Sequence, residues 1–108
     1  MDKIARTKIT WLTEQEGGRK SMIPLGVRYC PILIMDELEL SIEHEVDVRW
    51  SADMHNSEVL TSHQSLANLS YLVPEAPYHL LLPGNSFKLY EGDKLVAHGV
   101  ILDSDTLK

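Results

Sequence analysis

Alternating apolar and polar positions dominate this sequence, beginning with residues 4–12. Ala5, Thr7, Ile9 and Trp11 share one parity, and they alternate with Arg6, Lys8 and Thr10. Successive side chains of a strand point to opposite faces, so this period of two predicts a strand with one face directed inward. We expect further strands at residues 27–35, 58–63, 68–73, 78–82, 87–90 and 95–102.

The clearest periodicity covers residues 37–50. Its apolar parity contains Leu38, Leu40, Ile42, His44, Val46, Val48 and Trp50. A helix would distribute these side chains around its axis, whereas a strand, or two strands bent near His44, places them on a single face. We therefore predict a strand whose opposite, solvated face carries five carboxylates, namely Glu37, Glu39, Glu43, Glu45 and Asp47.

Turn-forming residues separate these runs. The two glycines of Glu16-Gly17-Gly18-Arg19 tolerate the positive φ of a tight reversal, and we expect them to join the strands at 4–12 and 27–35. Residues 51–57 are also typical of a turn, and Glu91-Gly92-Asp93 is typical of a hairpin. Seven or so short strands without a convincing amphipathic helix indicate an all-β barrel or sandwich.

Composition narrows the range of functions. A length of 108 residues favours one domain that spans residues 1–108. The formal net charge of −6, from 16 acidic and 10 basic side chains, disfavours a general polyanion binder and fits a basic protein partner. A single cysteine, Cys30, excludes an internal disulfide. Without a leader or a long apolar segment, we expect a cytoplasmic protein that does not associate with membranes.

Residues typical of catalysis, cofactor binding or metal binding do not cluster along the chain. The glycine-rich loops of nucleotide-binding proteins are missing, and the five histidines are spread singly. Cys30 precedes Pro31 in an apolar run, where we expect a small buried group. We therefore predict a non-enzymatic protein without cofactor, nucleotide or metal. Hydrolytic or transfer chemistry at Cys30 would need a pocket that brings a histidine to the thiol.

Three segments, in order along the chain, point to a known family. The first is residues 5–19, which ends in Glu16-Gly17-Gly18-Arg19; the second is Gly26-Val27-Arg28; the third is residues 82–100, with Glu91-Gly92 at its centre. They resemble the opening strand, the Gly-Tyr-Arg-Pro segment and the closing hairpin of the C-terminal β-barrel domain of translation elongation factor Tu and its eukaryotic relatives. Residues 36–68 match least.

This resemblance implies a closed antiparallel Greek-key barrel of about six to seven strands. In that family, the turns that carry Glu-Gly-Gly-Arg and Arg-Glu-Gly lie near the surface that meets aminoacyl-tRNA. The matching positions here are Arg19, Glu91 and Gly92. The family's GTPase domain is not part of this sequence, so translation-factor activity is not implied.

Two binding functions follow as expectations. The first is a protein-binding module that presents the acidic face of residues 37–47 to a basic partner. The alternative is an RNA-binding or tRNA-binding domain that uses Arg19, Lys20, Arg28 and the Glu91-Gly92 turn. Arg19 and Arg28 could instead close a barrel end by bonding to loop carbonyls. An open barrel edge would also allow pairing with a second copy of the chain.

Overall fold

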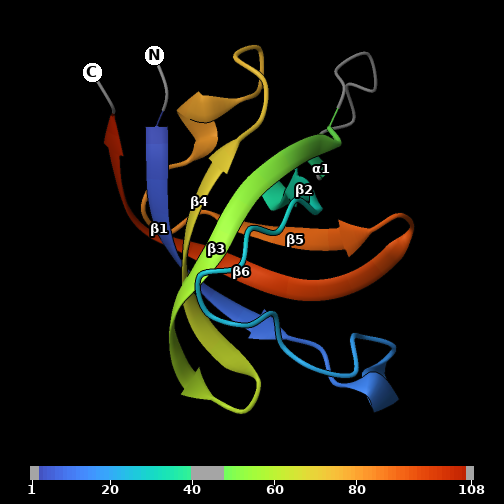
Figure 1. Ribbon diagram of the computed structural model, residues 1–108. Coiled ribbons are helices and arrows are strands. Elements are labelled where there is room, and N and C mark those ends of the chain that lie inside the picture. Colours follow the sequence, from blue (N-terminus) through green and yellow to red (C-terminus); the bar gives the residue numbers. More distant parts are fainter. Residues whose placement is uncertain (1–2, 40–47, 107–108) are drawn as a thin grey trace.

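The computed structural model describes residues 3–39 and 48–106 and shows a closed six-stranded barrel (Figure 1). Its strands run in the order β1-β4-β3-β2-β5-β6 around the barrel, and every neighbouring pair is antiparallel. The elements are β1 (Lys3–Trp11), η1 (Glu14–Glu16), β2 (Ile32–Met35), α1 (Asp36–Glu39), β3 (Trp50–Thr61), β4 (Gln64–Tyr71), η2 (Tyr78–Leu80), β5 (Ser86–Glu91) and β6 (Lys94–Thr106).

The strand order is that of a Greek key. Strands β2, β3 and β4 are consecutive neighbours, whereas β1 reaches β2 by a long connection and lies beside β4. Strand β6 pairs with both β5 and β1 and so closes the barrel. The prediction of an all-β, closed antiparallel Greek-key barrel is confirmed, with six strands.

The core contains the alternating apolar side chains from which the strands were predicted. Ala5, Ile9 and Trp11 of β1 are buried, as are Phe87 and Leu89 of β5. The polar parity of β1 faces outward, so its predicted inward and outward faces are confirmed. The β5–β6 hairpin also turns at Gly92, as predicted.

The paired glycines bend the chain, although not between neighbouring strands. Thr13 caps η1 by accepting a hydrogen bond from the Glu16 amide, and Gly17 ends it with φ at 92°. A Cβ at position 18 would lie 2.3 Å from the carbonyl oxygen of Leu12, so only glycine fits there. The expected reversal into a second, paired strand is wrong, because β1 pairs with β4 and β6 and never with β2.

The second predicted strand, 27–35, is much shorter in the structure. Only Ile32–Met35 is a strand, because Pro31 has no amide hydrogen to donate. Ahead of it, the chain runs along β3 with isolated bridges from Leu25 to Asn56 and from Tyr29 to Met54. This stretch, residues 24–29, therefore covers part of one edge of β3 without forming a regular strand.

The predicted strand at residues 37–50 is wrong at its beginning. Residues Asp36–Glu39 form the short helix α1, which follows β2 directly. The chain is held at this point because the Asp36 carboxylate accepts hydrogen bonds from Ser86 Oγ at 2.6 Å and from Lys88 Nζ at 2.9 Å. Residues 40–47 lie outside the described part of the chain, and the next strand begins at Trp50.

The turn predicted at residues 51–57 is part of β3 instead. Ala52, Met54 and Asn56 are buried, so the period of two continues through polar residues. A β-bulge between Asn56 and Glu58 then shifts the register against β4. The run expected as a strand at 78–82 contains η2.

A chain of buried hydrogen bonds links β1, β4 and β3 to the loop before β2. The indole Nε1 of Trp11 donates to Ser65 Oγ at 3.0 Å, and Ser65 Oγ donates to Asn56 Oδ1 at 2.8 Å. Asn56 Nδ2 in turn donates to the Ile23 carbonyl at 2.7 Å, while the Gly26 amide donates to the Asn56 carbonyl at 3.0 Å. These bonds satisfy the polar groups of a buried asparagine and fix the loop onto the barrel.

Candidate functional site

The turn that contains Arg19 and the turn that contains Glu91 meet at one end of the barrel. Arg19 Nη1 donates to Glu91 Oε2 across 72 residues of sequence. The Tyr29 hydroxyl donates to the same oxygen at 2.5 Å, and the Arg19 guanidinium lies 5.7 Å from the centre of the Tyr29 ring. We call Arg19, Tyr29 and Glu91 the Glu91 cluster.

The charges of the Glu91 cluster compensate one another. Burial alone would raise the pKa of Glu91, but hydrogen bonds from Tyr29 and Arg19 outweigh it and hold the pKa below its ordinary value. Burial, and then the bond to Glu91, raises the pKa of the Tyr29 hydroxyl, which stays a donor. The carboxylate is therefore ionised at neutral pH and pairs with the Arg19 cation.

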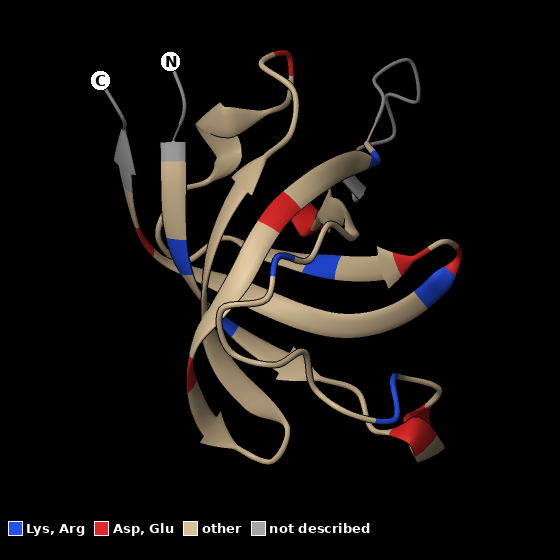
Figure 2. Ribbon diagram, viewed as in Figure 1, with Lys and Arg blue, Asp and Glu red and all other residues tan. Residues whose placement is uncertain are grey.

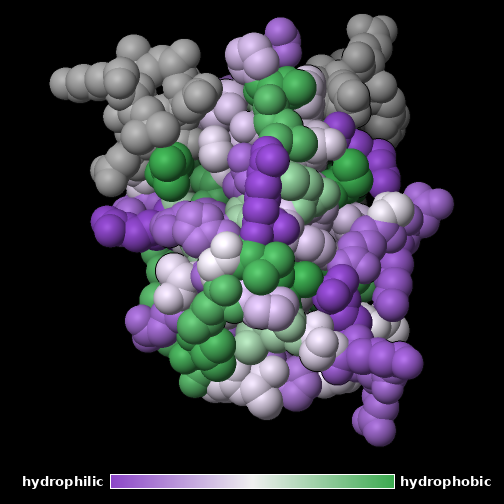
Figure 3. All heavy atoms as spheres, in the orientation of Figure 1, coloured by the Kyte–Doolittle hydropathy of each residue, from purple (hydrophilic) through white to green (hydrophobic). Residues whose placement is uncertain are grey.

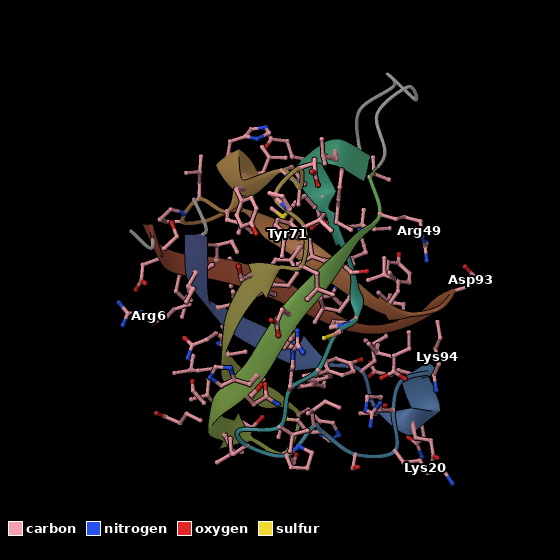
Figure 4. The ribbon with its side chains drawn as sticks, turned by 45° about the horizontal axis from the view of Figure 1, so that its top comes forward. Arg6, Lys20, Arg49, Tyr71, Asp93 and Lys94 are labelled. Atoms are coloured by element: carbon pink, nitrogen blue, oxygen red, sulfur yellow. The ribbon has the colours of Figure 1, made fainter. Side chains whose placement is uncertain are left out.

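The Glu91-Gly92 turn has a second arginine contact that the sequence did not suggest. Arg49 Nη2 donates to the Gly92 carbonyl at 2.8 Å, and it lies 3.8 Å from Asp93 Oδ1. Its guanidinium also lies 5.7 Å from the ring centre of Tyr90. Figure 4 shows Arg49 and Asp93 extending from the same side of the barrel. In the sequence, Arg49 was only one of the polar residues of the strand predicted at 37–50. Its contact with the Glu91-Gly92 turn depends on the folded barrel.

Lys20 and Arg28, the other predicted basic contacts, lie in different surroundings. Lys20 is exposed, and Figure 4 shows it extending outward from the loop after η1. It borders a small recess that is also lined by Arg19, Ser62 and His63. Arg28 forms two bonds with the Asp53 carboxylate, from Nε at 3.0 Å and from Nη2 at 3.2 Å. Of the predicted contacts, Arg19, Glu91 and Gly92 thus come together, and Lys20 borders the same loop.

Acidic and basic side chains are mixed at this end of the molecule. Figure 2 shows acidic residues of η1 beside the basic residues that follow it, and the same mixture at the β5–β6 turn. Of the predicted acidic face, Glu37 is exposed on α1, and α1 ends at Glu39. Glu43, Glu45 and Asp47 lie outside the described residues, so the acidic face stays a prediction.

An apolar surface at the β3–β4 hairpin was missed by sequence reasoning. Leu25, Val27, Val59 and Leu60 are exposed by 53%, 47%, 50% and 39%. Figure 1 shows the hairpin projecting from the barrel, and Figure 3 shows hydrophobic atoms gathered over its lower part. We call these four residues the hairpin apolar surface. The consecutive Val59 and Leu60 were the available signal, because a half-buried strand would alternate there.

The described residues offer little to metal or thiol chemistry. Residues 3–39 and 48–106 contain no group of three or more His, Cys, Asp or Glu side chains that could hold a metal ion. Cys30 is exposed, so the expectation of a buried thiol is wrong. Within the same described ranges, no helix is long and apolar enough to cross a membrane.

Comparison with protein-family models and with curated proteins found no match to this chain.

Proposed function

We propose that this protein is a non-enzymatic interaction module that binds another polypeptide at the β3–β4 hairpin. The observation that supports the proposal is the hairpin apolar surface, in which two large side chains of β3 and two of the loop that runs along it lie 39% to 53% exposed. Exposed apolar groups gathered at one place are typical of protein–protein contact sites, whereas single exposed residues are normal.

The backbone of β3 adds a second attraction for a polypeptide. Residues 24–29 cover its edge only as far as Asn56, whose carbonyl accepts from Gly26. An extended peptide could continue from that point by pairing with the strand beyond it. Main-chain hydrogen bonds would supply affinity, and Leu25, Val27, Val59 and Leu60 would contact the apolar side chains of the bound segment.

Site-specific photo-crosslinking tests this function. The photoreactive residue p-benzoylphenylalanine replaces Val59 in one variant and Leu102 in a control, because Leu102 is also exposed, at 45%, but belongs to β6. We expect a discrete cross-linked polypeptide from position 59 and none from position 102. Equal labelling at both positions, or none at position 59, would refute the proposal.

RNA binding is the second candidate, and the recess beside Lys20 is the observation that favours it. Lys20 and His63 line this recess together with Ser62. Arg19 and Arg28 each bind a carboxylate, so Lys20 and His63 would make the phosphate contacts. Lys20→Ala should then weaken binding to tRNA and reduce its salt dependence, measured by fluorescence anisotropy. An absence of binding by micromolar wild-type protein at low salt would count against RNA.

A basic partner at the acidic segment 37–47 remains the third candidate. Reversing the charges of Glu37, Glu39 and Glu43 should weaken capture of that partner, and most strongly at low salt. Capture that is unchanged by the triple reversal would contradict a role for this segment.

A further inference from the structure

Near the tip of the β3–β4 hairpin, one edge of β3 has no partner strand among residues 3–39 and 48–106. On the other edge, β3 pairs with β4 from Ala52 to Thr61. Strand β4 is itself covered by β1, up to the bond from the Trp11 amide to the His63 carbonyl. Toward β2, contacts to β3 end at Asn56, and no described residue pairs with 57–61 on that side.

The register of β3 indicates which backbone groups face this open edge. Ala52 donates to the Pro31 carbonyl, Met54 exchanges bonds with Tyr29, and Asn56 accepts from Gly26, so these three residues direct their backbone groups away from β4. The bulge between Asn56 and Glu58 inserts one residue and shifts this alternation by one. Val59 is therefore the next residue whose N–H and C=O face away from β4.

We propose that the partner of this edge is a second copy of the chain, paired antiparallel through β3 about Val59. This inference rests on the proposed function, because it names the polypeptide that binds there. An antiparallel pair with two-fold symmetry uses the same surface on both subunits. Val59 of each copy then exchanges both backbone hydrogen bonds with Val59 of the other.

The residues along the edge are compatible with such self-pairing. Antiparallel pairing about Val59 sets Glu58 opposite Leu60 of the second copy and Ser57 opposite Thr61. Glu58 is the only charged residue in this stretch, and it does not face its own counterpart. The usual protection of an edge, by lysine or proline, is missing between residues 57 and 61.

The exposed apolar residues outside β3 also fit this arrangement. In an antiparallel pair, the hairpin tip of one copy extends past Ser57 of the other and toward the loop that bridges Asn56. Leu25 and Val27, which belong to that loop, are 53% and 47% exposed. They would lie at both ends of the paired strands, where the symmetric hairpin tips could cover them.

Two features set the strength of the association. The second register shift, between Val59 and Thr61, limits the ladder to a few residues, so we expect a dissociation constant between about 1 µM and about 100 µM. Each copy carries a net charge of −6, so the copies repel one another at low salt. Raising NaCl from about 50 mM to about 500 mM should therefore tighten the dimer.

Sedimentation velocity from about 5 µM to about 500 µM protein tests the proposal. Wild-type protein should shift from monomer to dimer. Val59→Lys should raise the dissociation constant at least about tenfold, since it places two cations face to face, while Leu102→Lys should change it less than about twofold. A wild-type monomer at the highest concentration, or equal dimerisation of both variants, would overturn the inference.

Hydrogen exchange gives a readout that does not depend on how Val59→Lys folds. In wild-type protein, amides of residues 57–61 should exchange more slowly at high than at low protein concentration, and residues 94–102 of β6 should not change. Exchange at 57–61 that is independent of concentration would also overturn the inference. If the chain stays monomeric but position 59 cross-links to a different polypeptide, self-pairing fails and the proposed function stands.

Discussion

Replacing Asn56 should destabilise the protein more than any other single polar substitution in β3. Asn56 is 1% exposed, and its amide group bonds to both the Ile23 carbonyl and the Ser65 hydroxyl. Asn56→Ala leaves the Ile23 carbonyl without its donor and the Ser65 O–H without its acceptor, although Ser65 Oγ still accepts from the Trp11 indole. A buried polar group without a partner costs about 1–3 kcal/mol, so we expect the free energy of unfolding to fall by about 4 kcal/mol.

The measurement is chemical denaturation followed by Trp fluorescence, with the melting temperature as a check. A loss of about 4 kcal/mol lowers the melting temperature of a domain of this size by about 15 °C. Ser57→Ala, at the next position along the strand, is the matched control. The Ser57 hydroxyl donates to the Leu66 carbonyl at 3.3 Å on an exposed surface, so removing this hydroxyl should cost less than about 0.5 kcal/mol. Equal effects of the two substitutions would refute the role of the buried network.

A double substitution separates the network from the loss of side-chain volume. Ser65→Ala removes the group that joins Asn56 to the Trp11 indole. If the three residues act together, Asn56→Ala and Ser65→Ala combined should destabilise by less than the sum of the single effects, by at least about 0.5 kcal/mol. Strict additivity would mean that the hydrogen bonds are not energetically coupled.

Three further substitutions test the packing and charge of the barrel. Glu91→Gln should lower the free energy of unfolding at neutral pH. Because folding lowers the pKa of Glu91, its carboxylate stabilises the folded state above the pKa of the unfolded chain, and the difference in unfolding free energy from wild type should shrink between about pH 6 and about pH 3. A difference that stays constant over this range would contradict the pairing with Arg19. Tyr71 is buried, and its hydroxyl has no hydrogen-bond partner among the described residues. Tyr71→Phe should therefore leave the free energy of unfolding unchanged or raise it by about 1 kcal/mol. A clear decrease in this free energy, measured by urea denaturation, would contradict an unpaired hydroxyl. Gly99→Ala should lower the free energy of unfolding by about 1–3 kcal/mol, because the new Cβ would lie 2.3 Å from Phe87 Cζ. Adding Phe87→Leu should restore part of that loss in the same assay, and no recovery would contradict a clash with Phe87.

Local patterns were sufficient to predict much of the fold. The alternation in β1 and the Glu91-Gly92-Asp93 turn between β5 and β6 are each visible within a few consecutive residues, and both are confirmed. The alternation at 37–50 was misleading at its start, because the chain forms α1 where Asp36 binds Ser86 and Lys88, some 50 residues away. Polar residues at 51–57 suggested a turn, although a buried Asn56 can occupy a strand when its amide nitrogen and oxygen each have a partner.

The candidate sites were harder to predict because they depend on contacts between distant segments. Arg19 and Glu91 were both singled out, but their mutual bond spans 72 residues and needs the closed barrel. The open edge of β3 follows from the shortness of β2 and from a bulge, and neither has a reliable signal in a single sequence. Leu25 lies beside Asn56 of β3 only because the loop before β2 runs along that strand.

The pairing of β1 with β6 also affects how the chain acquires its structure during synthesis. Strand β1 leaves the ribosome first among the six strands, yet one of its two neighbours, β6, is made last. Contacts so far apart in sequence slow folding, since a long loop must be ordered before they form. One edge of β1 therefore stays open until β6 has been made, and the barrel closes only after that point, so incomplete chains present an unpaired edge at which they can mispair with one another.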